Sequence, residues 1–202
     1  MTDIRRVSTS APIHDLIAAR WSPRALDQDT PVSRQQITAL LEAARWAPSC
    51  FGDQPWRYLV WDRFADEAEW QQAFECLAEG NRAWVRKCPL LLAAVADSVF
   101  GRNGKPNRWA QYDTGAASEN LCLQATAMGL AAHQMGGFDK TRLAEIFQIP
   151  ERFTPMAMIA VGVPAAPDTL PKEFRDGETA PRERRALSDL AFDGRWGTGF
   201  TP

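Results

Sequence analysis

Residues 90–96, LLLAAVA, carry the strongest fold signal in the sequence. An unbroken apolar run of this length is typical of a strand that is buried on both faces. It is far too short to cross a bilayer, even when Pro89 is included. A second apolar run, Met156–Val163, predicts another buried strand. The fold should therefore contain a sheet whose inner strands are covered on both sides.

Further elements surround these two runs. Shorter strands are expected at Trp56–Trp61 and Leu130–Met135. Helical patterns begin at Ser10, at the Ser33–Gln36 capping box, at Asp66, at Asp113 and at Asp139. Gly80 should break the third helix, Gly129 should end the fourth, and Ser98–Arg108 should be a loop. Because the elements lack a regular βαβ rhythm, we predict a layered α+β fold rather than a doubly wound sheet.

Length and composition indicate one ordinary globular domain. The chain has 202 residues, 45% of them hydrophobic and 24% charged. A net charge of -2 and a pI of about 5.8 argue against a nucleic-acid binder. The opening MTDIRRVSTS lacks the apolar stretch of a signal peptide, and no run is long enough to span a membrane. We therefore expect a cytoplasmic protein that binds no membrane.

Cysteines and histidines do not form a metal or disulfide pattern. The four cysteines are scattered, without a C-x-x-C pair, and are expected to be small buried residues. The two histidines lie far apart and should be either exposed or satisfied in their hydrogen bonds. The Rossmann fingerprint, the G-x-S-x-G elbow and the H-E-x-x-H motif are all missing. Neither hydrolase nor metalloenzyme chemistry is supported.

Two arginine clusters suggest where an anion could bind. Arg20, Ser22 and Arg24 follow the end of a predicted helix, and a second group, Arg182, Arg184 and Arg185, lies near the end of the chain. The planar donor fork of arginine suits a phosphate group. Each cluster taken alone is better explained as a solvated charged surface.

The segment Ala47–Trp56, APSCFGDQPW, is the most distinctive loop. It joins a predicted helix to a predicted strand, and its two prolines stiffen it. Its small residues would allow it to lie flat against a planar ring. A tight helix-to-strand connection would explain the same composition. The C-terminal segment 164–202 is polar and has too little apolar surface for a core of its own, so it is either a flexible tail or an arm that packs on something else.

Three segments together resemble the FMN-dependent nitroreductase family. They are ARWSPRALD (Ala19–Asp27), EAARWAPSCFGDQPWRYLV (Glu42–Val60) and AMGLAAHQMGGFD (Ala127–Asp139). Weaker similarity is found at Gly80–Trp84 and Pro181–Gly197. The order of the segments is kept over nearly the whole chain. Two positions depart from the pattern: Cys50 stands where the family often has Ser, and Gly52 where it often has Asn.

The resemblance implies a fold and an activity. The fold is a three-layer α/β/α arrangement of the α+β class with a mixed, mainly antiparallel central sheet. Residues 1–202 would form one domain, with residues 164–202 as a domain-swapped arm on the partner subunit. The homodimer would hold FMN at its subunit interface. NADH or NADPH would reduce the flavin, and a nitroaromatic, quinone or other electron-poor small molecule would then be reduced in a ping-pong hydride transfer.

The resemblance also implies the cofactor-binding residues. They are Arg20, Trp21, Ser22, Arg24, Pro48, Ser49, Cys50, Gln54, Asn81, Met135, Gly136, Gly137, Arg184 and Arg185. Arg24 would meet the N1/C2=O edge of the flavin, and Gly136 or Gly137 would offer an N–H near N5. Pro48, Ser49 and Cys50 would come from the partner. Arg182 with Arg184 remains an alternative to Arg184 with Arg185 at the phosphate. No side chain is expected to act as nucleophile or general base.

Several alternatives stay open. The same fold resembles flavin-dependent dehydrogenases and dehalogenases. A non-catalytic FMN carrier or sensor, or a structural dimer without cofactor, would share many of these features. Trp84, Phe100 and Trp109 are candidates to cover the flavin, although core packing explains Trp84 equally well.

Overall fold

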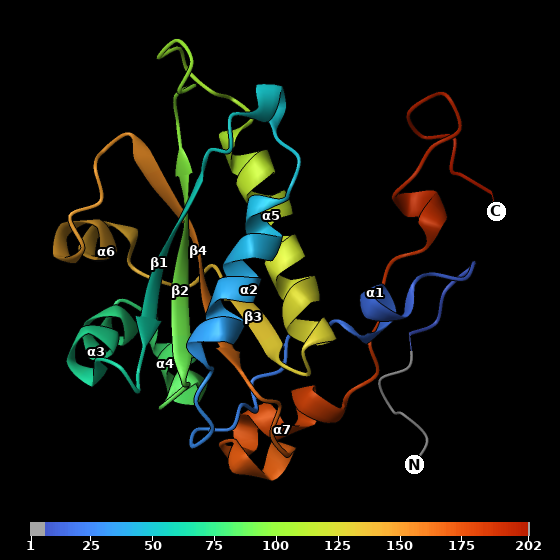
Figure 1. Cartoon of the computed structure of the whole chain (residues 1–202). Helices are drawn as coiled ribbons and strands as arrows, with labels where there is room; N and C mark the ends of the chain where they lie inside the picture. The colour runs from blue at the N-terminus through green and yellow to red at the C-terminus, as the bar shows by residue number, and fades with distance from the viewer. Residues whose placement is uncertain (1–6, 202) are drawn as a thin grey trace.

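A computed structural model describes residues 7–201 and places one four-stranded sheet between two layers of helices (Figure 1). The strands are β1 (Trp56–Asp62), β2 (Leu90–Asp97), β3 (Ala131–Met135) and β4 (Phe153–Gly162). Their order in the sheet is β1-β2-β4-β3, and all three neighbouring pairs are antiparallel. The predicted α+β class is confirmed. The described strands contain no parallel pair, so the parallel component of a mixed sheet is absent from them.

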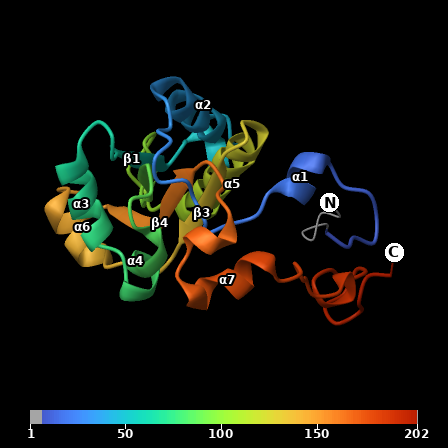
Figure 2. The ribbon, with the colours of Figure 1, turned by 90° about the horizontal axis from the view of Figure 1, so that it is seen from below.

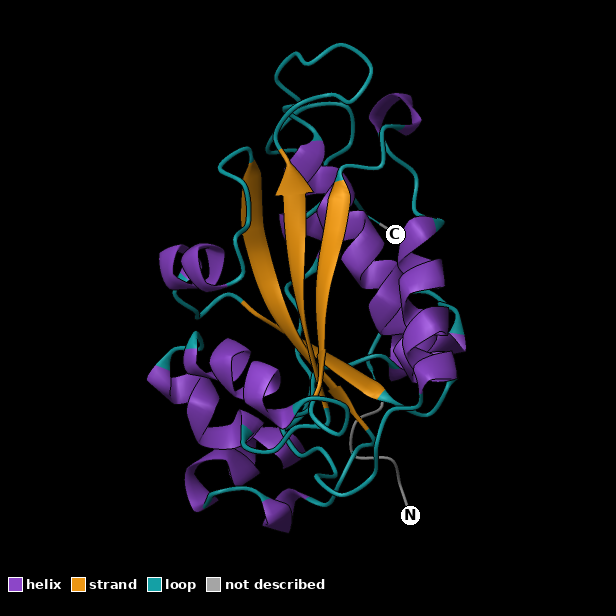
Figure 3. Cartoon of the chain, turned by 60° about the vertical axis from the view of Figure 1, so that its left-hand side comes forward, coloured by secondary structure: helices purple, strands orange, loops and turns teal. Residues whose placement is uncertain are grey.

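Helices cover both faces of this sheet, as Figure 3 shows with the strands between two groups of helices. On one face lie α2 (Arg34–Arg45) and α5 (Ala110–Ala127), and on the other lie α3 (Glu67–Glu75), α4 (Glu79–Val85) and α6 (Lys140–Ile146). The remaining helical segments are α1 (Asp15–Ala19), α7 (Lys172–Thr179) and the 3-10 turns Cys50–Gly52, Pro167–Thr169 and Leu187–Asp189. No described helix is long and apolar enough to cross a membrane.

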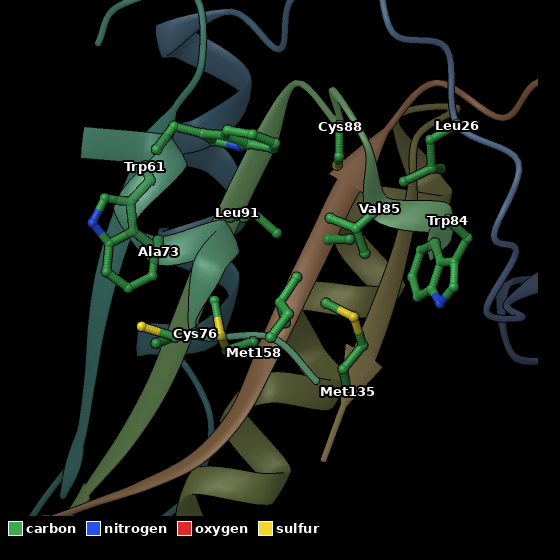
Figure 4. Close-up of a cluster of buried hydrophobic side chains, with 14 of the residues drawn as sticks. Leu26, Trp61, Ala73, Cys76, Trp84, Val85, Cys88, Leu91, Met135 and Met158 are labelled. Atoms are coloured by element: carbon green, nitrogen blue, oxygen red, sulfur yellow. The ribbon is translucent and has the colours of Figure 1, made fainter. Parts of the chain in front are cut away.

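The apolar run of β2 is explained by two separate cores. Alternate residues Leu91, Ala93 and Val95 face the α3-side core, part of which Figure 4 shows. The intervening Leu90, Leu92 and Ala94 face the α5-side core. Because a strand points successive side chains to opposite faces, burial on both faces requires an apolar residue at every position. The prediction from LLLAAVA is confirmed.

Local signals set several boundaries as expected. The Ser33 hydroxyl accepts from the Gln36 amide and the Gln36 side chain accepts from the Ser33 amide, which confirms the capping box at the start of α2. Gly129 adopts a left-handed φ of 71° just after α5, where an L-residue would be strained.

Two expected boundaries are wrong. Gly80 does not break a helix but lies inside α4, because the burial of Trp84 and Val85 in the α3-side core outweighs the poor helix propensity of glycine. The first helix begins at Asp15 instead of Ser10, with the His14 side chain as its N-cap.

The two ends of the described chain extend beyond the layered body. Figures 1 and 2 show α1 and the segment after α7 together on one side, away from the sheet. Residues 164–182 nevertheless pack on their own chain: Leu26 and Pro164 form a β-bridge, and the Ala165 amide donates to the Ala25 carbonyl. Beyond Arg182 most of the large apolar side chains are exposed, including Leu187, Leu190 and Phe200, with Trp196 at 91%. The arm expected from residues 164–202 would pack on a second chain and stays a prediction.

Candidate functional site

The end of α1 is held by the C-terminal segment. Arg182 donates from both terminal nitrogens, to the carbonyls of Ala18 and Arg20, each at 2.7 Å. These carbonyls are among the groups that a helix leaves without an internal partner at its C-terminal end. Arg182 therefore fixes the position of Arg20, although the two arginines lie 162 positions apart in the chain.

Arg20 lies at the centre of one arginine cluster. Its guanidinium donates to the Ser22 hydroxyl at 3.4 Å and forms an ion pair with Glu119 of α5 at 3.3 Å. Arg20, Arg182 and Arg184 line a cavity of about 280 Å³ that also includes Glu119. Of the two pairs that the sequence left open, the structure brings Arg182 and Arg184 to Arg20, while Arg185 does not line this cavity. Three guanidinium groups against one carboxylate make the cavity suitable for an anion.

Arg24 is positioned by helix α7. The carboxylate of Glu178 accepts from the backbone amides of Arg24 and Ala25, at 2.9 and 3.2 Å. Glu178 is only 2% exposed. On the same face of α7, Phe174 places its ring centroid 5.7 Å from the Arg24 guanidinium. Sequence reasoning missed Glu178, because no local pattern connects residues that lie 154 positions apart.

Asn81 and Gly137 form a second part of the site. The Asn81 amide donates to the Gly137 carbonyl at 2.9 Å and accepts from the Trp84 indole at 3.3 Å, so its orientation is fixed. A Cβ added to Gly137 would lie 2.9 Å from the Asn81 nitrogen, so any larger residue would displace the Asn81 side chain. Gly136 and Gly137 are exposed, and neither backbone N–H has a hydrogen-bond partner among residues 7–201. Two donors therefore face outward beside Asn81.

Two residues that were expected to contact the flavin are buried in the structure. Met135 is 3% exposed and its side chain packs in the α3-side core, so within one chain it does not present its side chain to a ligand (Figure 4). Trp84 is 6% exposed, which favours the core-packing interpretation over a lid. Trp21 and Ser22 are half-buried between Arg20 and Arg24.

His133 connects the arginine segment to β3. Its Nδ1 lies 3.0 Å from the Pro23 carbonyl, and because a carbonyl only accepts, Nδ1 carries the proton. The ring packs on Trp84 with centroids 4.5 Å apart. Burial lowers the pKa of His133, and the nearby positive charge of Arg24 lowers it further, against the opposing effect of the Pro23 carbonyl. The imidazole is therefore neutral at neutral pH and anchors the segment that carries Arg24.

The distinctive loop lies apart from these groups in the single chain. Pro48, Ser49 and Gln54 line a different cavity, of about 380 Å³, to which none of Arg20, Arg24 or Arg184 contributes. Figure 1 shows this loop at the opposite end of the sheet from α4 and α7. The Cys50 amide donates to Asp113 at 2.9 Å. The Gln54 amide donates to the Ser49 hydroxyl at 3.0 Å. The structure thus holds the loop rigidly but does not bring it to the arginines within one chain.

Comparison with known proteins identifies the family. The model of the nitroreductase family matches residues 17–163. The crystal structure of an oxidoreductase that contains FMN superposes with a TM-score of 0.88 and 34% identity, covering 97% of this chain and 98% of that one. A protein of Bacillus subtilis (strain 168), named "Putative NAD(P)H nitroreductase YdgI", is 26% identical over 184 residues, which cover 73% of this chain and 86% of YdgI.

A second named relative is similar over more of the chain. Protein DrgA of Synechocystis sp. (strain ATCC 27184 / PCC 6803 / Kazusa) is 28% identical over 198 residues, which cover 86% of this chain and 89% of DrgA. The part of the chain that the family model matches includes Arg20, Asn81 and Gly137. This chain belongs to the nitroreductase family.

Proposed function

We propose that this chain is an FMN-dependent oxidoreductase that uses NADH or NADPH to reduce electron-poor small molecules such as nitroaromatics and quinones. The observation that carries the proposal is the pairing of an arginine-lined cavity at Arg20 with the outward-facing amides beside Asn81. The family assignment, the FMN in a similar oxidoreductase and the name of YdgI support it.

The residues present fit the chemistry of FMN. Arg20, Ser22 and Arg184 supply the charged and hydroxyl donors that a phosphate requires. The missing Cβ at Gly137 leaves a flat approach for a planar ring, and a Cβ there would collide with Asn81. Gly136 or Gly137 would donate an N–H to the ring.

Bound FMN would supply the hydride chemistry, as cofactors do in such enzymes. The chain's own contribution is orientation and charge. Arg24 would hold the pyrimidine edge and place a positive charge where negative charge develops on reduction. Glu178 and His133 hold the backbone on either side of Arg24, so this charge is positioned before any ligand arrives. No described side chain needs to act as a nucleophile.

We further propose that the active form is a cytoplasmic homodimer with FMN at the interface. Residues 183–201 are almost entirely exposed and would pack on the partner. Trp46 and Phe51, at 75% and 72% exposure, flank Pro48, Ser49 and Cys50, which would complete the partner's site. Large exposed apolar side chains of this kind mark interaction surfaces.

The first test is a visible absorption spectrum of the purified protein, followed by anaerobic titration with NADH and NADPH. A yellow protein that is bleached by one nucleotide supports the proposal and identifies the donor. A flavoprotein that neither nucleotide reduces is a carrier or a dehydrogenase with another donor. The Arg20→Ala, Arg24→Ala double variant should lose FMN. A colourless wild-type protein that cannot be reconstituted with FMN contradicts the proposal.

A further inference from the structure

A cavity of about 340 Å³, lined in part by Arg24, lies between the end of α4 and the turn that precedes α7. It is distinct from the cavity at Arg20 and from that at Pro48. Its walls come from three separate parts of the chain. The charged residues among those that line it are Arg24, Arg86, Lys87, Asp168 and Arg175.

Positive charge dominates this cavity. Four cationic side chains line it against the single carboxylate of Asp168, a surplus of three positive charges. Within residues 7–201, the side chains of Arg86 and Lys87 form no ion pair or hydrogen bond. Within the same residues, the guanidinium of Arg24 forms no ion pair or hydrogen bond and lies 5.7 Å from the ring centroid of Phe174. Like charges that converge without a protein partner repel one another, so an anion placed among them would be stabilised.

The walls of the cavity are held by two further arginine interactions. Arg63, with a side chain only 13% exposed, donates to the Gln28 carbonyl and, at 3.0 Å, to the Lys87 carbonyl. Arg175 donates to the carbonyls of Leu170 at 2.8 Å and Asp168 at 3.0 Å. These bonds fix the backbone of all three walls. They also occupy carbonyl oxygens that would otherwise repel an anion.

We propose that this cavity binds the phosphate group of a small-molecule ligand. Guanidinium and ammonium donors match phosphate oxygens. At ~30 Å³ for each water molecule of the liquid, the cavity would hold about eleven waters, which is room for a phosphate or pyrophosphate group but not for a whole dinucleotide. Arg24 belongs both to this cavity and to the proposed flavin site, so a phosphate held here would lie next to the cofactor. This adjacency rests on the proposed function, whereas the anion site itself does not.

The test measures the binding of inorganic pyrophosphate by calorimetry to the purified protein with its cofactor. The test variant is Arg86→Ala, Lys87→Ala, and the matched control is Arg34→Ala, Lys105→Ala, which removes the same charge at exposed positions outside the cavity. Wild type and control should bind pyrophosphate, and the test variant should bind it more weakly by about tenfold per lost cation. Higher salt should weaken the binding.

Steady-state kinetics then identify the source of the phosphate. A rise in KM for NADPH alone in the test variant assigns the cavity to the 2′-phosphate, and an equal rise for NADH assigns it to the bridging pyrophosphate. Unchanged KM values with lost pyrophosphate binding assign it to a free phosphate ion or another phosphorylated ligand. The proposal is overturned if wild type does not bind pyrophosphate, if the test variant binds it equally, or if saturation with FMN abolishes the binding. A protein that binds pyrophosphate here but never binds FMN would refute the proposed function alone.

Discussion

Replacement of Glu178 by alanine tests how Arg24 is positioned. The carboxylate accepts from two backbone amides, those of Arg24 and Ala25, and Ala25 is 1% exposed. Without the carboxylate, the buried Ala25 amide has no hydrogen-bond partner. The Arg24 amide also loses its partner, but it is only half-buried and can be partly solvated. A buried donor that loses its partner costs about 1–3 kcal/mol. Since only one of the two amides is fully buried, we expect a total loss of about 2–4 kcal/mol in the free energy of unfolding.

This loss should be visible as a change in melting temperature. For a chain of this size, 1 kcal/mol shifts Tm by about 2–4 °C, so Glu178→Ala should melt about 10 °C lower. Glu178→Gln keeps one acceptor oxygen and should lose about half as much. Thermal unfolding followed by circular dichroism measures both variants. Glu173→Ala, at an exposed position of the same helix, is the control and should change the stability by less than about 0.5 kcal/mol.

Titration of the apoprotein with FMN separates a positioning role from a purely structural one. If Glu178 positions Arg24, Glu178→Gln should bind FMN more weakly even at a temperature where it is fully folded. An unchanged FMN affinity in a clearly destabilised Glu178→Gln protein would show that the contact only stabilises the fold. A Glu178→Ala protein that melts within about 1 °C of wild type would refute the magnitude derived from the buried amides.

Three further predictions follow from single contacts. Gly137→Ala should displace the Asn81 amide and weaken FMN binding, while the free energy of unfolding falls by less than about 2 kcal/mol. FMN titration and urea unfolding measure the two effects. An FMN affinity equal to that of wild type would contradict the steric argument. The pKa of His133 is lowered on folding, so the neutral imidazole favours the native state, and the free energy of unfolding should fall as the pH drops below 6.5. His133→Asn keeps a donor to the Pro23 carbonyl without the titrating ring. The midpoint of urea unfolding should therefore depend less on pH in this variant than in wild type. A thiol reagent should label only Cys50 in the folded protein, because the other three thiols are buried; rapid labelling of more than one thiol would contradict this.

Local features of the fold could be predicted from the sequence where the signal lies within a few residues. The apolar run of β2, the Ser33–Gln36 capping box and the left-handed Gly129 are of this kind. Gly80 was misinterpreted because helix α4 owes its stability to Trp84 and Val85 in a core assembled from distant segments. A propensity scale contains no information about such contacts.

The candidate site divides in the same way. The family resemblance supplied Arg20, Asn81 and Gly137, and the structure brings Asn81 and Gly137 into contact. It also indicated Met135, whose side chain is buried in the core. Glu178 and His133 escaped prediction, because their partners at Arg24 and Pro23 lie more than a hundred positions away. The role of the Pro48–Cys50 loop depends on a second chain and stays a prediction.

The two-sided burial of β2 affects how the sheet finds its alignment. In a sheet with one solvent-exposed face, shifting the pairing of a strand by one residue exposes its apolar side chains to water, which costs free energy immediately. Here both faces are apolar, so polarity offers no such penalty. Side-chain volume does provide a penalty. A slip by one residue would move Leu91, Ala93 and Val95 into the core that now holds Leu90, Leu92 and Ala94, and the reverse. One core would then contain gaps and the other would be overfilled. Misaligned states should therefore remain compact and be rejected only when side chains interlock, which places the selection of register late in folding.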